Sequence, residues 1–138
     1  EDSLSATLSF ENGAFASVLL SDAAVAPWSY EATSGENPTY FRTHEDCYRF
    51  VGTTGALAFP TLRLWRYANP QQVGWQHPLE MSEQSVEAAD PLVRQLEHFC
   101  RVIRGEEAPF VSGQDGTRSL AVILALLESA ENNRVVVL

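Results

Sequence analysis

The chain has 138 residues, of which 45% are hydrophobic and 20% charged, a balance typical of a folded globular domain and not of a disordered segment. Its 18 acidic residues face nine arginines and no lysine, so the net charge is −9. Nucleic acids and anionic membranes are bound by clustered basic side chains, and this composition therefore disfavours both as partners. The lack of lysine also excludes Schiff-base chemistry and a P-loop.

The first twenty residues predict a β-hairpin. Apolar side chains alternate with serine and threonine over residues 3–10, which is the period of a strand with one buried face. Asn12-Gly13 follows, a pair that favours the tight turns of hairpins. Residues 14–20 are apolar on both faces, so we expect a central strand that is covered on two sides.

Further strands are expected before position 80. Residues 28–33 form a short candidate strand inside an irregular stretch that runs from position 21 to position 44. Alternating runs then occur at 47–51, 56–59, 62–67 and 73–79, separated by turn-forming glycine, asparagine and proline. Together with the hairpin, these runs predict an antiparallel meander.

The second half of the chain predicts two helices. Asp90 is a suitable N-cap, Pro91 suits the first helical position, and Gly105 ends the first helix. A second helix is expected to begin after a capping box at Ser112 and to end at the Asn-Asn pair, before a short final strand at 134–138. The fold class expected is α+β: one domain over residues 1–138, with an open, mostly antiparallel sheet of six or seven strands and two helices on one face.

Two helices cover only one face of such a sheet, so the other face needs a partner. Arg63, Trp65 and Tyr67 lie on alternate positions of one expected strand, and Trp75 is expected to align with them. A monomer rarely leaves such an aromatic surface in water, so we predict a homodimer through this face. The alternative is a stacking platform for sugar rings, centred on Trp65 and Trp75.

The sequence contains no complete set of catalytic residues, and no metal site is predicted. His44, Glu45 and Asp46 combine an imidazole with carboxylates, which suits acid–base work or metal binding, but polar residues at a strand entry are also commonly just solvated. His98 is expected at a surface or domain contact. Residues 112–116 lack the spacing of a phosphate loop, and helix capping explains them better.

The cysteines and the start of the chain bear on its setting. Cys47 and Cys100 share no metal-binding or redox spacing, which favours a reducing compartment and predicts a cytoplasmic location. The chain begins Glu-Asp-Ser without a signal peptide, and we expect it to be a piece of a longer polypeptide.

Several stretches, in order, resemble the C-terminal domain of the glucose–fructose oxidoreductase / inositol dehydrogenase / MocA family. They are Phe-Glu-Asn-Gly-Ala at 10–14, Gly-Thr-Thr-Gly-Ala-Leu at 52–57, Asp-Pro-Leu at 90–92, Gln-Leu-Glu-His-Phe at 95–99, Val-Ile-Arg-Gly-Glu at 102–106, Pro109, Ser112-Gly113 and Ser129-Ala130. Each is weak alone, but their order and spacing extend over nearly the whole chain.

The resemblance implies that the chain is one of the two domains of an oxidoreductase. In this family an N-terminal Rossmann domain binds NAD or NADP, and the substrates are typically sugars, cyclitols and related polyols. The glycine-rich fingerprint and the Glu-Lys-Pro motif of the family are absent here. We therefore transfer no catalytic residue, and we expect the chain alone neither to bind the cofactor nor to transfer hydride.

The resemblance also implies that this domain faces the substrate and forms dimers, and it leaves open whether two dimers pair into a tetramer. The candidate substrate-binding residues, by position, are Trp28, Tyr30, Tyr40 and His44. Two of them, Trp28 and Tyr40, are equally explained as packing residues of their loop. The functional alternatives are a non-enzymatic dimeric module that binds carbohydrate and a purely structural dimerisation module.

Overall fold

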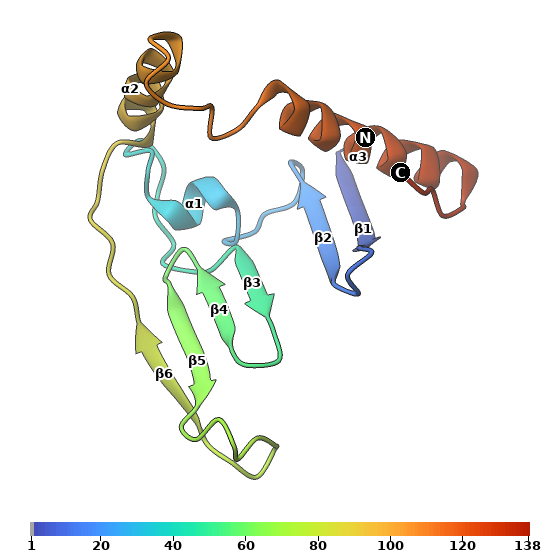
Figure 1. Cartoon of the computed structure of the whole chain (residues 1–138). Helices are drawn as coiled ribbons and strands as arrows, with labels where there is room; N and C mark the ends of the chain where they lie inside the picture. The colour runs from blue at the N-terminus through green and yellow to red at the C-terminus, as the bar shows by residue number, and fades with distance from the viewer. Residues whose placement is uncertain (1) are drawn as a thin grey trace. The chain divides into compact units, whose positions relative to one another are not determined.

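The computed structural model describes residues 2–138, which form two units of an α+β fold. One unit contains residues 2–24 and 92–138, a hairpin and two helices (Figure 1). The other contains residues 25–91, a short helix and a four-stranded sheet. The expected α+β class is confirmed, but the six strands fall into two separate sheets instead of one. The expectation of a single domain stays a prediction.

The hairpin of the first unit consists of β1 (Ser3–Ser9) and β2 (Phe15–Ser21). The strands are antiparallel, with Leu4 opposite Leu20, and the turn residue Gly13 has a φ of 85°. The expected hairpin is therefore confirmed. The expected central position of β2 is wrong, because within residues 2–138 this strand pairs only with β1.

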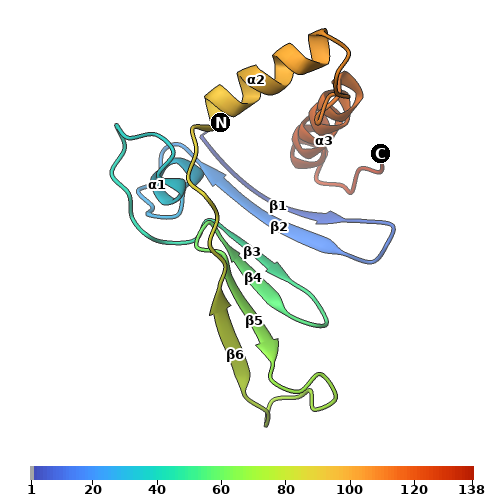
Figure 2. The same ribbon diagram turned by 60° about the vertical axis from the view of Figure 1, so that its left-hand side comes forward.

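The sheet of the second unit is an antiparallel meander in the order β3-β4-β5-β6, as Figure 2 shows from a second direction. Its strands are β3 (Tyr48–Val51), β4 (Ala56–Phe59), β5 (Arg63–Tyr67) and β6 (Leu79–Glu83). The expected meander is confirmed, but its last strand lies later in the chain than the sequence predicts. Residues 73–79, expected as that strand, form a loop up to Leu79 because Gly74 has a φ of 138° and accepts a turn hydrogen bond from the backbone of His77.

A second correction concerns residues 28–33, which were expected to form a strand. The chain instead forms the helix α1 (Tyr30–Ser34). Ser29 caps this helix, since its side-chain oxygen accepts a hydrogen bond of 3.2 Å from the backbone N–H of Ala32. Gly35 ends it in the left-handed conformation.

The two predicted helices are confirmed as α2 (Pro91–Ile103) and α3 (Gly113–Asn132). The expected capping box is present: the side chain of Ser112 accepts from Asp115 N, and that of Asp115 accepts from Ser112 N. Residues 134–138, expected as a strand, are not one, because Arg134 exchanges two hydrogen bonds with Ser129 that turn the chain back on the helix end.

Burial is confined to the second unit among the described residues, where Thr33, Asp46 and Ala58 are the buried side chains. The apolar stripes of α2 and α3 stay exposed, with Phe99 at 58% and Ile123 at 55%. None of the described helices has the length and apolar character needed to cross a membrane. The best-packed part of the described chain is thus the region where the segment before β3 meets the β4–β5 turn.

Candidate functional site

The loop over residues 25–46 carries all four candidate substrate-binding residues. Hydrogen bonds of Thr43 join the end of this loop to its beginning. The Thr43 backbone N–H donates to the Ala32 carbonyl at 2.9 Å, and its hydroxyl donates to the Pro27 carbonyl at 2.7 Å. Trp28 follows Pro27 directly, and His44 follows Thr43. The loop therefore brings Trp28 and His44 to neighbouring backbone positions, although they are far apart in sequence.

Tyr30 packs the loop onto the sheet. Its ring stacks on Phe59 of β4, with centroids 6.2 Å apart and planes 12° apart. Its hydroxyl donates a hydrogen bond of 2.8 Å to Glu36. This bond to Glu36, followed by burial, raises the pKa of Tyr30 to about 12. The phenol is therefore protonated and engaged, so its main role in this structure is packing.

The other three candidates are also exposed to solvent. Trp28 is 58% exposed and Tyr40 is 54% exposed, while His44 is also exposed. Tyr40 lies on a turn that its backbone N–H closes onto Asn37. Packing alone does not account for Trp28 and Tyr40, because about half of each side chain faces water.

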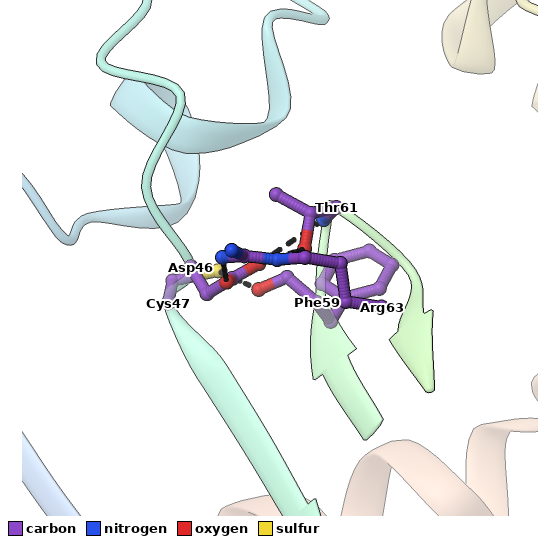
Figure 3. A network of polar contacts seen from close by, with 5 residues as sticks. All are labelled: Asp46, Cys47, Phe59, Thr61 and Arg63. Carbon is purple, nitrogen blue, oxygen red and sulfur yellow. Dashed lines mark hydrogen bonds and ion pairs between the residues drawn. The ribbon is translucent and has the colours of Figure 1, made fainter. Parts of the chain in front are cut away.

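Asp46 anchors the end of the loop, a role that the sequence analysis missed. The residue is only 4% exposed. One carboxylate oxygen accepts from the backbone N–H of Thr61 at 3.1 Å and from its hydroxyl at 2.7 Å. The other pairs with the Arg63 guanidinium at 2.5 Å (Figure 3). The next residue, Cys47, continues this attachment, since its backbone N–H donates to the Phe59 carbonyl at 2.9 Å.

The charge of Asp46 is stabilised by these partners. Burial by itself would raise the pKa of this carboxyl, but the hydrogen bonds from Thr61 and Arg63 outweigh it and hold the pKa below its ordinary value. These hydrogen bonds engage both carboxylate oxygens of Asp46 with Thr61 and Arg63. Among residues 2–138, no group of three or more His, Cys, Asp or Glu side chains is placed to hold a metal ion.

The predicted interface residues are only partly brought together. Arg63, Trp65 and Tyr67 occupy alternate positions of β5 and so share one face of the sheet. Trp75 does not lie on this strand face, because it belongs to the loop between β5 and β6, where it is fully exposed. Arg63 lies 5.7 Å from the centre of the Trp65 ring and is tied to Asp46, so it is not a free cation.

The end of the sheet away from Asp46 holds a shallow depression of about 330 Å³ at the β3–β4 hairpin. Apolar side chains such as Phe50 and Leu64 line it together with Arg66. Gly55 is required here, since a Cβ atom on it would lie 2.7 Å from the carbonyl oxygen of Trp65. None of the candidate substrate-binding residues lines this depression.

His98 proves to be a structural residue of the first unit. Its Nδ1 lies 2.8 Å from Glu107, and its Nε2 accepts a hydrogen bond of 3.1 Å from the backbone N–H of Phe110. Hydrogen bonds from His98 and then from Arg101 lower the pKa of Glu107. These contacts fasten the segment that connects α2 to α3.

The family model "Oxidoreductase family, C-terminal alpha/beta domain" matches residues 1–138. The chain belongs to this Gfo/Idh/MocA oxidoreductase family. The resemblance seen in the sequence is thereby confirmed over the full length, and the Rossmann domain is not detected in this chain. Searches of curated proteins and of solved structures gave no match.

Family membership identifies the part of an oxidoreductase that the chain represents, its C-terminal domain. The Gly-Thr-Thr-Gly-Ala-Leu stretch of the family resemblance is the β3–β4 hairpin, where Gly55 is needed for close backbone approach. The exposed groups of the 25–46 loop include the aromatic rings of Trp28, Tyr40 and Phe41 and the imidazole of His44. Such groups stack on apolar faces and hydrogen-bond to hydroxyls.

Proposed function

We propose that this chain is the substrate-facing and oligomerisation domain of an NAD(P)-dependent oxidoreductase that acts on a sugar, a cyclitol or a related polyol. The observation that carries the proposal is the family match over the whole chain, combined with a tied loop that exposes Trp28, Tyr40 and His44. A polyol has apolar ring faces and polar edges, and this combination of side chains is complementary to both.

Each part of the loop has a distinct task in this proposal. Trp28 and Tyr40 provide stacking surfaces, and His44 exchanges a hydrogen bond with a substrate hydroxyl. Tyr30 attaches the loop to the sheet through its ring contact with Phe59. NAD or NADP, held by a Rossmann domain, accepts or supplies the hydride. The chain contains no lysine, the catalytic residue of the family's Glu-Lys-Pro motif, and we assign to it the binding and orientation of the substrate.

The oligomerisation part of the proposal concerns the β5 face. The register places Met81 opposite Trp65 and Leu79 opposite Tyr67, so all four share one face. Met81 and Leu79 are 50% and 56% exposed. Surfaces rich in aromatic residues, Met and Arg are typical of interface centres. A homodimer through this face, and a tetramer formed by pairing dimers, are the assemblies we propose.

Light scattering on the isolated chain tests this assembly. We expect dimers at high micromolar concentration and monomers in the variant Met81→Glu, which places a charge on the proposed interface. The variant Trp75→Ala, outside the strand face, is the matched control and should still form dimers. A strictly monomeric wild-type chain would count against the interface.

Tryptophan fluorescence during titration with myo-inositol and D-glucose separates the enzyme domain from a carbohydrate-binding module. The module requires saturable binding that is lost in Trp65→Ala. The structure gives this alternative little support, because the Arg63 guanidinium already lies over the Trp65 ring. If the chain is instead the enzyme domain, we expect turnover only when the family's Rossmann domain precedes it. Trp28→Ala and His44→Ala should then lower the affinity for the substrate.

A further inference from the structure

Two residues of the 25–91 unit that are not glycine have a left-handed backbone. His44 has a φ of 59° and Leu62 a φ of 55°. Among the described residues Asn133 is the third such case, but it caps α3, where asparagine commonly adopts this conformation. For a residue with a Cβ atom the left-handed region typically lowers the folding equilibrium constant roughly five- to thirtyfold. Such a conformation persists only where surrounding contacts enforce it.

Hydrogen bonds of the residues next to His44 and Leu62 converge on Asp46. Leu62 lies between Thr61 and Arg63, and both of these neighbours bond to the Asp46 carboxylate. His44 lies between Thr43, which is bonded to Pro27 and Ala32, and Asp46 itself two positions later. The buried carboxylate thus joins the two segments that carry His44 and Leu62.

We propose that Asp46 is a positioning residue, which together with Thr43 holds His44 in the left-handed conformation and so fixes the direction in which its imidazole leaves the loop. This inference rests on the proposed function, in which His44 meets a substrate hydroxyl. Asp46 does not touch the substrate, because it is buried and its oxygens are occupied by Thr61 and Arg63. In this proposal the strained backbone of His44 serves to orient a ligand and does not stabilise the fold.

The first arm of the test measures strain by comparing His44→Gly with His44→Ala in denaturant unfolding. Both variants remove the imidazole, but only glycine adopts a positive φ without steric cost. We expect the folding equilibrium constant of His44→Gly to exceed that of His44→Ala about fivefold. An equal or larger constant for alanine would overturn the proposal, since His44 would then be unstrained.

The second arm asks whether Asp46 imposes the strain. The glycine–alanine comparison is repeated in Asp46→Asn and in Thr43→Val, which separately weaken the two anchors. The fivefold advantage of glycine should shrink toward unity in each background, a coupling that a double-mutant cycle measures directly. If the advantage stays the same in both backgrounds, Asp46 and Thr43 do not position His44. Thr43→Val serves as the folded alternative should Asp46→Asn not fold.

The third arm separates this proposal from the proposed function. The imidazole carbon resonance of His44 should be single and dispersed in the wild-type chain, and should move toward its unfolded position in Asp46→Asn and Thr43→Val. Turnover is then measured in the polypeptide in which the family's Rossmann domain precedes this chain. A dispersed His44 resonance without turnover of any polyol supports the positioning and contradicts the proposed function. An undispersed, mobile His44 in the wild-type chain overturns the positioning.

Discussion

Thr43 and Pro27 are joined across sixteen positions of the chain by a hydrogen bond of 2.7 Å from the Thr43 hydroxyl to the Pro27 carbonyl oxygen. Trp28 and His44, the residues that follow these two, reach neighbouring places through this bond. This one hydrogen bond of the Thr43 hydroxyl therefore determines that the backbones of Trp28 and His44 lie close together in the exposed loop.

Removing that hydroxyl tests its influence. Thr43→Val keeps the shape of the side chain, and we expect it to lower the free energy of unfolding by about 1 kcal/mol. Urea unfolding followed by tryptophan fluorescence gives this value. Thr39→Val is the control, because the Thr39 hydroxyl bonds only to Asn37, two residues away. An equal effect of both variants would show that the contact across the loop has no special weight.

Asp46 should make stability depend on acid pH. Its pKa is lowered in the folded chain, so its contribution is complete above the ordinary carboxyl pKa of about 4 and is lost as the pH falls through the lower folded value. We expect Asp46→Asn to reduce the free energy of unfolding at neutral pH by about 1–3 kcal/mol and to flatten this part of the pH dependence. The exposed neighbour Glu45, changed to Gln, should change stability by less than about 0.5 kcal/mol. An unaltered acid limb in Asp46→Asn would contradict the assignment.

Tyr30 should make stability depend on alkaline pH in the opposite sense. Because its folded pKa is raised to about 12, its contribution is complete below the ordinary tyrosine pKa near 10 and is lost as the pH rises toward 12. Ultraviolet absorbance of tyrosinate should show one group titrating near the raised value. This step should be absent from Tyr30→Phe and should move down in Glu36→Gln, which removes the accepting carboxylate. A wild-type chain without such a late step would refute the Tyr30–Glu36 bond.

Gly55 and Gly116 should respond in opposite directions to replacement by alanine. A Cβ at position 55 would lie 2.7 Å from the Trp65 carbonyl oxygen, whereas one at position 116 meets nothing within 4 Å. Gly55→Ala should therefore destabilise the sheet by about 1–3 kcal/mol. Gly116→Ala, inside α3, should stabilise the chain by up to about 1 kcal/mol. Thermal unfolding of the two variants provides the comparison, and a tolerated alanine at 55 would be inconsistent with the close approach.

The elements governed by local pattern were predictable from the sequence. The alternation of residues 3–10 and the capping box at Ser112 led to the right strand and helix. The apolar character of β2 suggested two covered faces, yet Phe15 and Leu19 are 78% and 79% exposed. The Ser29 cap was present in the sequence, but the aromatic and β-branched residues that follow favoured a strand instead.

The contacts of the site were not predictable, because they depend on tertiary structure. Asp46 meets Thr61 and Arg63 at separations of fifteen and seventeen residues, which no local spacing rule reports. His98 likewise finds its partners nine and twelve residues away. Composition and order indicated which residues belong to the loop, whereas the roles of Tyr30 and Asp46 required the fold.

The most direct test of the proposed function is steady-state reduction of NAD or NADP by a panel of cyclitols and sugars. It uses a polypeptide in which the family's Rossmann domain precedes residues 1–138. We predict turnover of at least one polyol, with a raised KM in Trp28→Ala and in His44→Ala and unchanged kinetics in Trp75→Ala. Turnover unaffected by Trp28→Ala and His44→Ala together would contradict the assignment of this loop to the substrate.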